Sequence, residues 1–362
     1  LFRSGSVVLD ASPAASGGTV AAPQGGRIRI ADGARIDVGT AAKDGTPSAA
    51  RGGLVTLRAE RLGGTGLGID VLPADAITGA RAIHVEGTQV RTSATLDMAA
   101  AHTANNTFMS TANLAQLRAA LGIDGADPRW HIRPHVEYRS SGDFTISADE
   151  NLNARRYVSN AEAGSLTIRA AGNILVNGSL SDGFSTATTA GLLQSQHSGW
   201  NITLAAGADT GAAAAASLRS ADVLVAEGKG DLRLAANKFV RTGAGSIEAF
   251  AGRDIVLGVG ATLYSAGVAD VPGDLAFTNA TRVSGGSPAS RAAEYPTNGG
   301  DVTLRAAGSV LAAQSNQLVS QWLYRQGSVD ADGSIPTVGS ATQLRNLTWY
   351  PRFDQFAHGV AT

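Results

Sequence analysis

One short phrase recurs along this chain and limits its possible folds more than any other feature. The phrase places a polar residue, often threonine, between two apolar residues and then exits through alanine and glycine. This alternation has the period of a β-strand that buries one face. Copies of the phrase lie at 54–59, 144–148, 166–172, 202–207, 232–236, 247–252 and 302–308.

A second short apolar segment follows several of these copies, after the glycine-containing exit. The segments 174–176, 255–257 and 310–311 occupy this place. A strand, a corner and a second strand are typical of one coil of a β-solenoid, in which successive coils stack on each other. We therefore predict an all-β solenoid with loop and short helical insertions. A β-sandwich or jelly roll is the alternative, but neither is expected to repeat one phrase so often.

The composition agrees with closely stacked coils and excludes several kinds of site. Glycine supplies 45 residues, whereas aromatic residues make up only 5%, which favours tight turns over a bulky globular core. The 29 lysines and arginines nearly balance the 30 aspartates and glutamates, so we expect no nucleic-acid partner. The lack of cysteine excludes disulfides, thiolate metal sites and a cysteine nucleophile.

Two interruptions divide the predicted solenoid. We expect β-helix coils at 1–91 and 142–265, an insertion with a short helix at 92–141, a long loop at 266–300, and further coils with a C-terminal aromatic segment at 301–362. In the insertion, 112–121 has leucines at helical spacing, Ser110 or Thr111 can cap its start, and Gly122 can end it. The insertion either projects as a binding element or covers an apolar flank of the stack.

The densest group of functional residue types lies at the end of this insertion. It contains Trp130, His131, Arg133, His135 and Tyr138. Two histidines four residues apart bind a metal when they lie on a helix, but here they alternate with arginine along an extended segment. We therefore expect ligand contact with a carboxylate or phosphate, with no metal and no cofactor. The alternative is a solvated strand face without a ligand.

No catalytic centre is evident in the sequence. The paired glycines lack the lysine and hydroxyl residue that complete a phosphate-binding loop. Glycoside cleavage needs two or three carboxylates that converge on one face, whereas the acidic residues here are scattered over predicted corners. We expect that the protein is not an enzyme. A carbohydrate-active β-helix, such as a polysaccharide lyase or glycoside hydrolase, is the alternative.

Two copies of the phrase, at 164–174 and 299–310, resemble the repeats of the filamentous haemagglutinin family, the exoproteins of bacterial two-partner secretion. The resemblance covers most of 5–91 and 142–311. It implies a right-handed parallel β-helix in a protein secreted to the bacterial cell surface, where family members act as adhesins, biofilm factors or toxin-delivery stalks. The implied partners are an outer-membrane two-partner secretion transporter and a host or neighbouring-cell receptor or glycan.

The sequence departs from the family at the motifs used for export. The asparagine–proline motifs of the family's secretion domain are not evident, and the chain begins at Leu1 without a signal peptide. We therefore expect a fragment whose transporter recognition lies in another region of the parent protein. The expected function is a rigid stalk that presents binding loops for cell adhesion or biofilm formation. Self-association into an extracellular filament is a further alternative.

Overall fold

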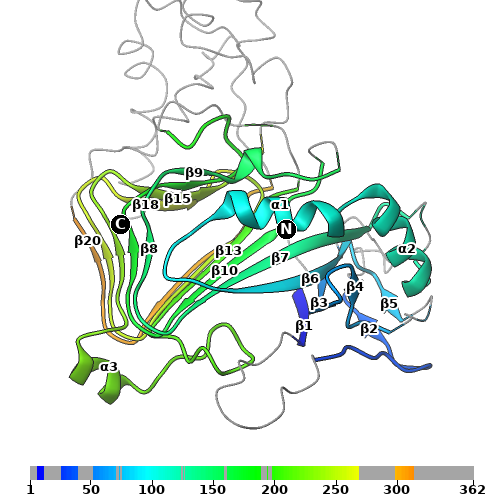
Figure 1. Ribbon diagram of the computed structural model, residues 1–362, viewed down its shortest axis with the longest axis horizontal. Helices are drawn as coiled ribbons and strands as arrows, with labels where there is room; N and C mark the ends of the chain where they lie inside the picture. Colours follow the sequence, from blue (N-terminus) through cyan, green and yellow to red (C-terminus); the bar gives the residue numbers. More distant parts are fainter. Residues whose placement is uncertain are drawn as a thin grey trace, which may run out of the picture.

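The described part of the chain is built mainly from parallel β-strands, and the strands of its longest sheet lie side by side in a curled layer (Figure 1). The computed structural model describes residues 6–11, 26–39, 52–70, 73, 76–123, 125, 127–158, 161–188, 194, 198–268 and 298–313. Neighbouring strands along the path of this long sheet are all parallel. In spatial order they are β1 (Ser6–Ala11), β3 (Leu54–Leu62), β6 (Ala82–Thr92), β7 (Trp130–Ser140), β10 (Ser165–Ala170), β13 (Asn201–Ala206), β16 (Ile247–Ala251) and β19 (Val302–Ala306).

Two shorter parallel sheets complete the stack from β7 onward, because the chain visits three sheets in turn. The second sheet contains β8 (Phe144–Ile146), β11 (Ile174–Val176), β14 (Leu232–Leu234), β17 (Ile255–Leu257) and β20 (Val310–Ala312). The third contains β9 (Glu150–Asn151), β12 (Leu180–Ser181), β15 (Phe239–Thr242) and β18 (Thr262–Ser265). Nearer the N-terminus, β2 (Ile36–Asp37) pairs with β5 (Ile77–Thr78), and β4 (Gly66–Leu67) is antiparallel to β3. This order of strands agrees with the predicted solenoid.

The alternation of the repeated phrase sorts side chains between the two faces of the long sheet. Leu166 pairs with Val136 on one side and with Ile202 on the other, and Ile202 pairs with Ile247. All four side chains are buried in one continuous apolar core. Residues on this inner face hold the layers together through apolar burial, as the sequence pattern predicts.

The long sheet contains a step at β6 and β7, which are its longest strands. β3 pairs with the first part of β6 and ends its pairing where Glu60 meets Thr88. Thr88 pairs with His135 of β7, and His135 pairs with Ser165, the first residue of β10. The strands before β6 and those after β7 are therefore displaced along the strand direction, and the two long strands join an N-terminal stack to a C-terminal stack.

A ladder of side chains joins the coils at the corner before the second sheet. Asp143 Oδ1 accepts a hydrogen bond from Asn173 N, and Asn173 Oδ1 accepts one from Asp231 N. In the next two coils, Asp231 Oδ1 accepts a hydrogen bond from Asp254 N, and Asp254 Oδ1 accepts one from Ser309 N. Each short polar side chain thus satisfies a backbone N–H of the next coil, which fixes the register at a bend where the sheet hydrogen bonds stop.

Replacing Asn173 with alanine removes the central member of this ladder. Asn173→Ala is expected to lower the free energy of unfolding by about 1 kcal/mol, because one hydrogen bond between partly buried groups is lost. Urea unfolding followed by circular dichroism measures the change. The control is Asn177→Ala, since Asn177 is exposed and its side chain has no ladder contact. Equal stabilities of the two variants would contradict the ladder's role.

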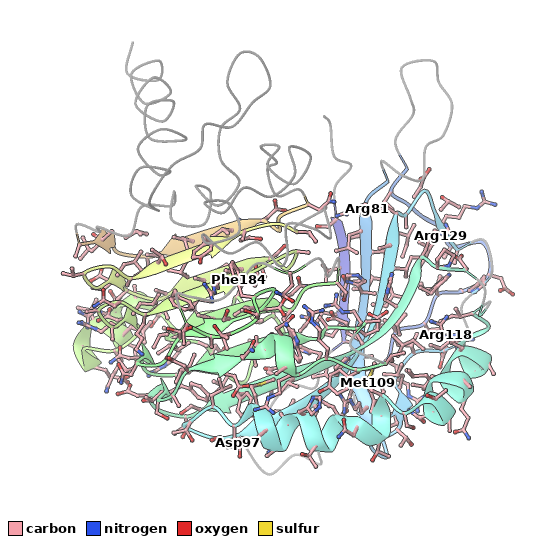
Figure 2. The ribbon with its side chains drawn as sticks, turned by 90° about the horizontal axis from the view of Figure 1, so that it is seen from above. Arg81, Asp97, Met109, Arg118, Arg129 and Phe184 are labelled. Carbon is pink, nitrogen blue, oxygen red and sulfur yellow. The ribbon has the colours of Figure 1, made fainter. Side chains whose placement is uncertain are left out.

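The insertion is packed onto the stack by two helices, α1 (Met98–Phe108) and α2 (Thr111–Leu121). The prediction of α2 is confirmed: Ser110 caps its start, and Gly122 ends it in the left-handed conformation. The helix α1 was not predicted. Both helices bury apolar side chains in the same core as the strands. Figure 2 shows the helices at one end of the stacked strands, with the orange β19 and β20 at the other.

Other expected boundaries differ from the structure. The range 92–141 was assigned to the insertion, but β7 lies within it and pairs with both β6 and β10, so that assignment is wrong for 130–140. A third helix, α3 (Ala221–Glu227), interrupts the coils expected at 142–265. Of the long loop expected at 266–300, only 266–268 and 298–300 are described, and the aromatic segment near the C-terminus lies outside the described residues.

Candidate functional site

The five residues selected from the sequence all lie on β7, but the strand divides them between two faces. Trp130 and Tyr138 point to the inner face, where Trp130 packs against the core and Tyr138 is only 1% exposed. His131, Arg133 and His135 occupy the opposite, outer face, as the alternation predicts. The structure therefore does not bring the five side chains together into one contact surface.

The outer face of the step carries a dense group of polar residues, which we call the outer-face cluster. Except for the half-buried His84 and His131, every member is buried, so the alternative of a solvated strand face is wrong. Arg133 is 2% exposed and His135 is 1% exposed. The members on β6, β7 and β10 are His84, Glu86, Thr88, His131, Arg133, His135, Glu137, Arg139, Ser165, Thr167 and Arg169.

Arg133 is the central donor of the outer-face cluster. Its Nε donates to the Ala163 carbonyl oxygen at 2.9 Å, and its Nη2 donates to the carbonyl oxygens of Gly164 at 2.9 Å and Gly199 at 2.6 Å. Gly164 and Gly199 precede β10 and β13, so one guanidinium of β7 binds the starts of the next two strands of the long sheet. Its Nη1 also lies 2.9 Å from His84 Nδ1.

His135 and Glu86 occupy the middle of the outer-face cluster. The two ring nitrogens of His135 each lie 2.9 Å from a threonine hydroxyl, Thr88 on β6 and Thr167 on β10. Burial lowers the pKa of His135 well below its usual range, and the charge of Arg58 lowers it further. Burial raises the pKa of Glu86, but the charges of Arg58 and Arg133 outweigh this effect and bring it to about 2.

His131 faces the edge of the outer-face cluster and binds a residue outside the sheet. Its Nδ1 lies 2.7 Å from Glu162 Oε1, and its ring meets that of His84 edge to face at 5.6 Å. In the described part of the chain, no group of three histidine, aspartate or glutamate side chains is arranged to hold a metal ion. His131 contacts Glu162, Arg133 contacts the carbonyl oxygens at the starts of two strands, and His135 contacts two threonines, so these side chains tie strands and corners together.

The outer-face cluster makes the folded state sensitive to acid. The unfolded chain takes up a proton on His135 below about pH 6.5, whereas the folded chain keeps this buried ring neutral. His135 alone is therefore expected to lower the free energy of unfolding by about 1.4 kcal/mol for each pH unit below 6.5, until its folded pKa is reached. His84, whose pKa is also lowered well below its usual range by burial and by the charge of Arg133, adds to this loss. Glu86 adds a further loss below about pH 4.5, which continues to its folded pKa of about 2.

The histidine contribution can be measured with the variant His135→Gln, which keeps a side chain able to bond both threonines. Urea unfolding at pH 5.0 to 7.5 is expected to give a flatter dependence of stability on pH in this variant than in the native chain. Parallel curves for the two proteins would contradict the assignment of a neutral His135.

The inner-face residue Tyr138 contributes to a separate feature, which we call the edge notch. This open cavity of about 470 Å³ is lined by Val90, Arg91, Thr92, Ser93, Thr95, Asp97 and Tyr138. The Tyr138 hydroxyl donates to the Asp97 carbonyl oxygen at 2.6 Å, and the Arg91 guanidinium carbon lies 6.0 Å from the Tyr138 ring centroid. No binding motif in the sequence marks Arg91 or Asp97. The only sequence signal at Asp97 is that of a helix cap, and its Oδ1 accepts from Ala100 N.

The chain matches no family model, no curated protein and no solved structure. Within the described ranges, no helix has the length and apolar character needed to cross a membrane.

Proposed function

We propose that this chain is a stretch of right-handed parallel β-helix that forms a rigid stalk in a secreted bacterial surface adhesin. The observation that carries the proposal is the unbroken parallel pairing of the long sheet from β1 to β19, with two further parallel sheets beside it from β8 to β20. Repeat folds of this kind bury a continuous core, and each coil contacts only its neighbours. The result is an elongated body whose length grows with each coil.

The contacts between coils support a mechanical role. Backbone hydrogen bonds run between successive strands of three sheets, and side-chain ladders join the corners. Arg133 and Arg156 add buried bonds that cross between segments, including the Arg156–Asp182 ion pair at 2.8 Å. Bending the stack would break several of these contacts at once, which favours stiffness over flexibility.

The adhesive and secretory parts of the proposal rest on the resemblance of the repeats to the filamentous haemagglutinin family. On this proposal the parent protein crosses the outer membrane through a two-partner secretion transporter, which recognises a different region. It then remains at the cell surface and binds a host or neighbouring-cell receptor or glycan.

Four acidic residues at or near the corners have structural partners, which favours the stalk over the enzymatic alternative. Asp143 and Asp149 each accept a backbone N–H from the next coil and also bind a lysine. Glu162 binds His131, and Glu150 binds Arg155. No observation on these residues favours a second function.

The stalk role can be tested by placing the chain between a bacterial surface anchor and a short peptide epitope. Cells that carry the native chain are expected to capture more antibody-coated beads than cells that carry a flexible glycine–serine linker of about ten residues. The reason is that the eight parallel strands of the long sheet, stacked about 4.8 Å apart, hold the epitope at a fixed distance of about 34 Å, whereas ten flexible residues have an r.m.s. length of about 17 Å. Equal capture at equal epitope density would overturn the stalk.

Adhesion is tested with the same cells lacking the epitope. Attachment to epithelial cells and to biofilm matrix is expected to exceed that of anchor-only cells. Attachment equal to that of anchor-only cells would overturn the adhesive part and leave the stalk to be judged by bead capture.

A further inference from the structure

The edge notch exposes a length of strand edge because of the step in the long sheet. β6 pairs with β7 as far as Thr92 but with β3 only as far as Thr88. After Glu60, the residue of β3 that pairs with Thr88, the last two residues of β3 pair with the antiparallel strand β4. Residues 89–92 therefore have a paired neighbour on one side only among the described strands.

The backbone direction of β6 identifies which groups face the open side. Ile83 N donates to Arg129 O and Ser93 N donates to Arg139 O, so the odd-numbered residues of β6 direct their backbone groups toward β7. Successive residues of a strand point their N–H and C=O groups to opposite edges. Val90 and Thr92 therefore present their N–H and C=O groups to the edge notch.

The chain fills the corresponding gap on the other side of the step. β10 begins opposite His135, which leaves the first half of β7 without a strand partner on that side. Here Glu162 binds His131, and Arg133 binds the carbonyl oxygens of Ala163 and Gly164. The first half of β7 is thus occupied by residues 162–164, whereas the edge of β6 remains an open cavity.

The charge and shape of the edge notch indicate what fits there. Arg91 is half-buried and its guanidinium interacts with Tyr138, and it forms no ion pair with any residue in the described ranges. The Asp97 carboxyl group also lines the edge notch, but its Oδ1 caps α1 by accepting a hydrogen bond from Ala100 N. An acidic side chain on an added strand would give the Arg91 guanidinium an ion-pair partner. A sugar is the less suitable ligand, because sugars usually stack on an open aromatic face and Tyr138 is only 1% exposed.

We propose that the edge notch binds a short extended peptide of a partner protein, which adds to β6 as a strand and places an acidic side chain against Arg91. Strand addition supplies affinity through the backbone groups of Val90 and Thr92, and the Arg91 contact supplies selectivity. The site lies at the helix-bearing end of the C-terminal stack, where Asp97 is labelled in Figure 2. This inference does not depend on the proposed stalk function.

The test uses the full chain and a fluorescein-labelled five-residue peptide that alternates valine and threonine around a central glutamate. Saturable binding is expected by fluorescence anisotropy. A peptide with a central lysine, and one N-methylated at alternate residues, are each expected to bind at least about tenfold more weakly. The first loses the ion pair, and the second loses the donors that a strand needs.

Variants of the chain identify the site. Thr92→Pro removes an N–H at the open edge and is expected to weaken binding about tenfold, whereas Thr92→Ala keeps that N–H and is expected to bind within about twofold of the native chain. Arg91→Glu is expected to exchange the preference, so that the lysine-centred peptide binds more tightly than the glutamate-centred one. Circular dichroism confirms that each variant is folded.

Several outcomes would overturn the proposal. They are no binding of the glutamate-centred peptide, equal binding of its N-methylated form, or an unchanged preference in Arg91→Glu. Binding of a glucuronic-acid disaccharide in place of the peptide would assign the edge notch to acidic sugars and also overturn it. These measurements use neither bead capture nor cell attachment, so their failure would leave the stalk and adhesion proposals unaffected.

Discussion

Arg133→Met is expected to lower the free energy of unfolding by about 3–5 kcal/mol, which is typical when one partner of a buried charged network is removed. Methionine keeps most of the length of the side chain but has no donors. The carbonyl oxygens of Ala163 and Gly199 would then lose the guanidinium that binds them. Each unsatisfied buried carbonyl costs about 1–3 kcal/mol, so the loss is large even if packing is preserved.

The control for this prediction is Arg129→Met, one residue before β7. Arg129 binds Asp127 through a surface ion pair and its side chain is 37% exposed, so this variant is expected to change stability by less than about 1 kcal/mol. Urea unfolding of both variants gives the comparison. Similar losses in the two would contradict the view that Arg133 joins the starts of β10 and β13.

The amino-acid composition of β7 explains why the candidate site residues were expected to lie in an insertion. Its outer face carries charged and ring side chains, which are typical of a solvated surface or a binding site. Pro134 also argues against a central strand, because proline lacks a backbone donor. Ser140 O faces β10, since it accepts from Ala171 N, so Pro134 faces the same side. At Pro134 that side has no strand, because β10 begins opposite His135, and the missing N–H costs nothing.

The repeated phrase predicted strands well but could not predict the sheet to which each belongs. The copies at 166–172 and 202–207 form β10 and β13 of the long sheet, whereas the copy at 144–148 forms β8 of the second sheet. Three residues of apolar–polar–apolar alternation look the same on either side of a coil. The pairing of β8 with β11 depends on the corners that precede these two strands. At these corners Asn173 N donates a hydrogen bond to Asp143 Oδ1, which aligns the two coils.

The two candidate sites were only partly predictable for the same reason. The alternation placed His131, Arg133 and His135 on one face, which the structure confirms. Their burial depends on the step in the long sheet, which brings residues 162–164 against β7. The edge notch also arises from this step, and no local pattern in 90–97 marks it. The helix α1 was missed because its alanine, asparagine and threonine residues give only a weak apolar stripe at Met98, Ala101 and Phe108.

A column of glycines at one corner sets the closest approach between coils. Gly199, Gly245 and Gly300 precede β13, β16 and β19 in successive coils of the stack. A Cβ atom on Gly245 would lie 1.9 Å from the Trp200 carbonyl oxygen, and one on Gly300 would lie 2.2 Å from the Gly245 carbonyl oxygen. These distances are far inside van der Waals contact and involve backbone atoms, which cannot rotate away. The glycine-rich composition therefore reflects close stacking here and not only the bends of the corners.

Gly245→Ala is consequently expected to lower the free energy of unfolding by about 3 kcal/mol, because the coils on both sides must shift to admit one methyl group. Gly142→Ala is the matched control, because a Cβ atom on Gly142 would meet no atom within 4 Å. This variant is expected to raise the free energy of unfolding by no more than about 1 kcal/mol. Urea unfolding measures both, and hydrogen exchange of the β13 and β16 amides locates the effect. If Gly245→Ala matched Gly142→Ala in stability, glycine at this corner would be serving the bend alone, and the spacing of the coils would be set by the side chains of the core.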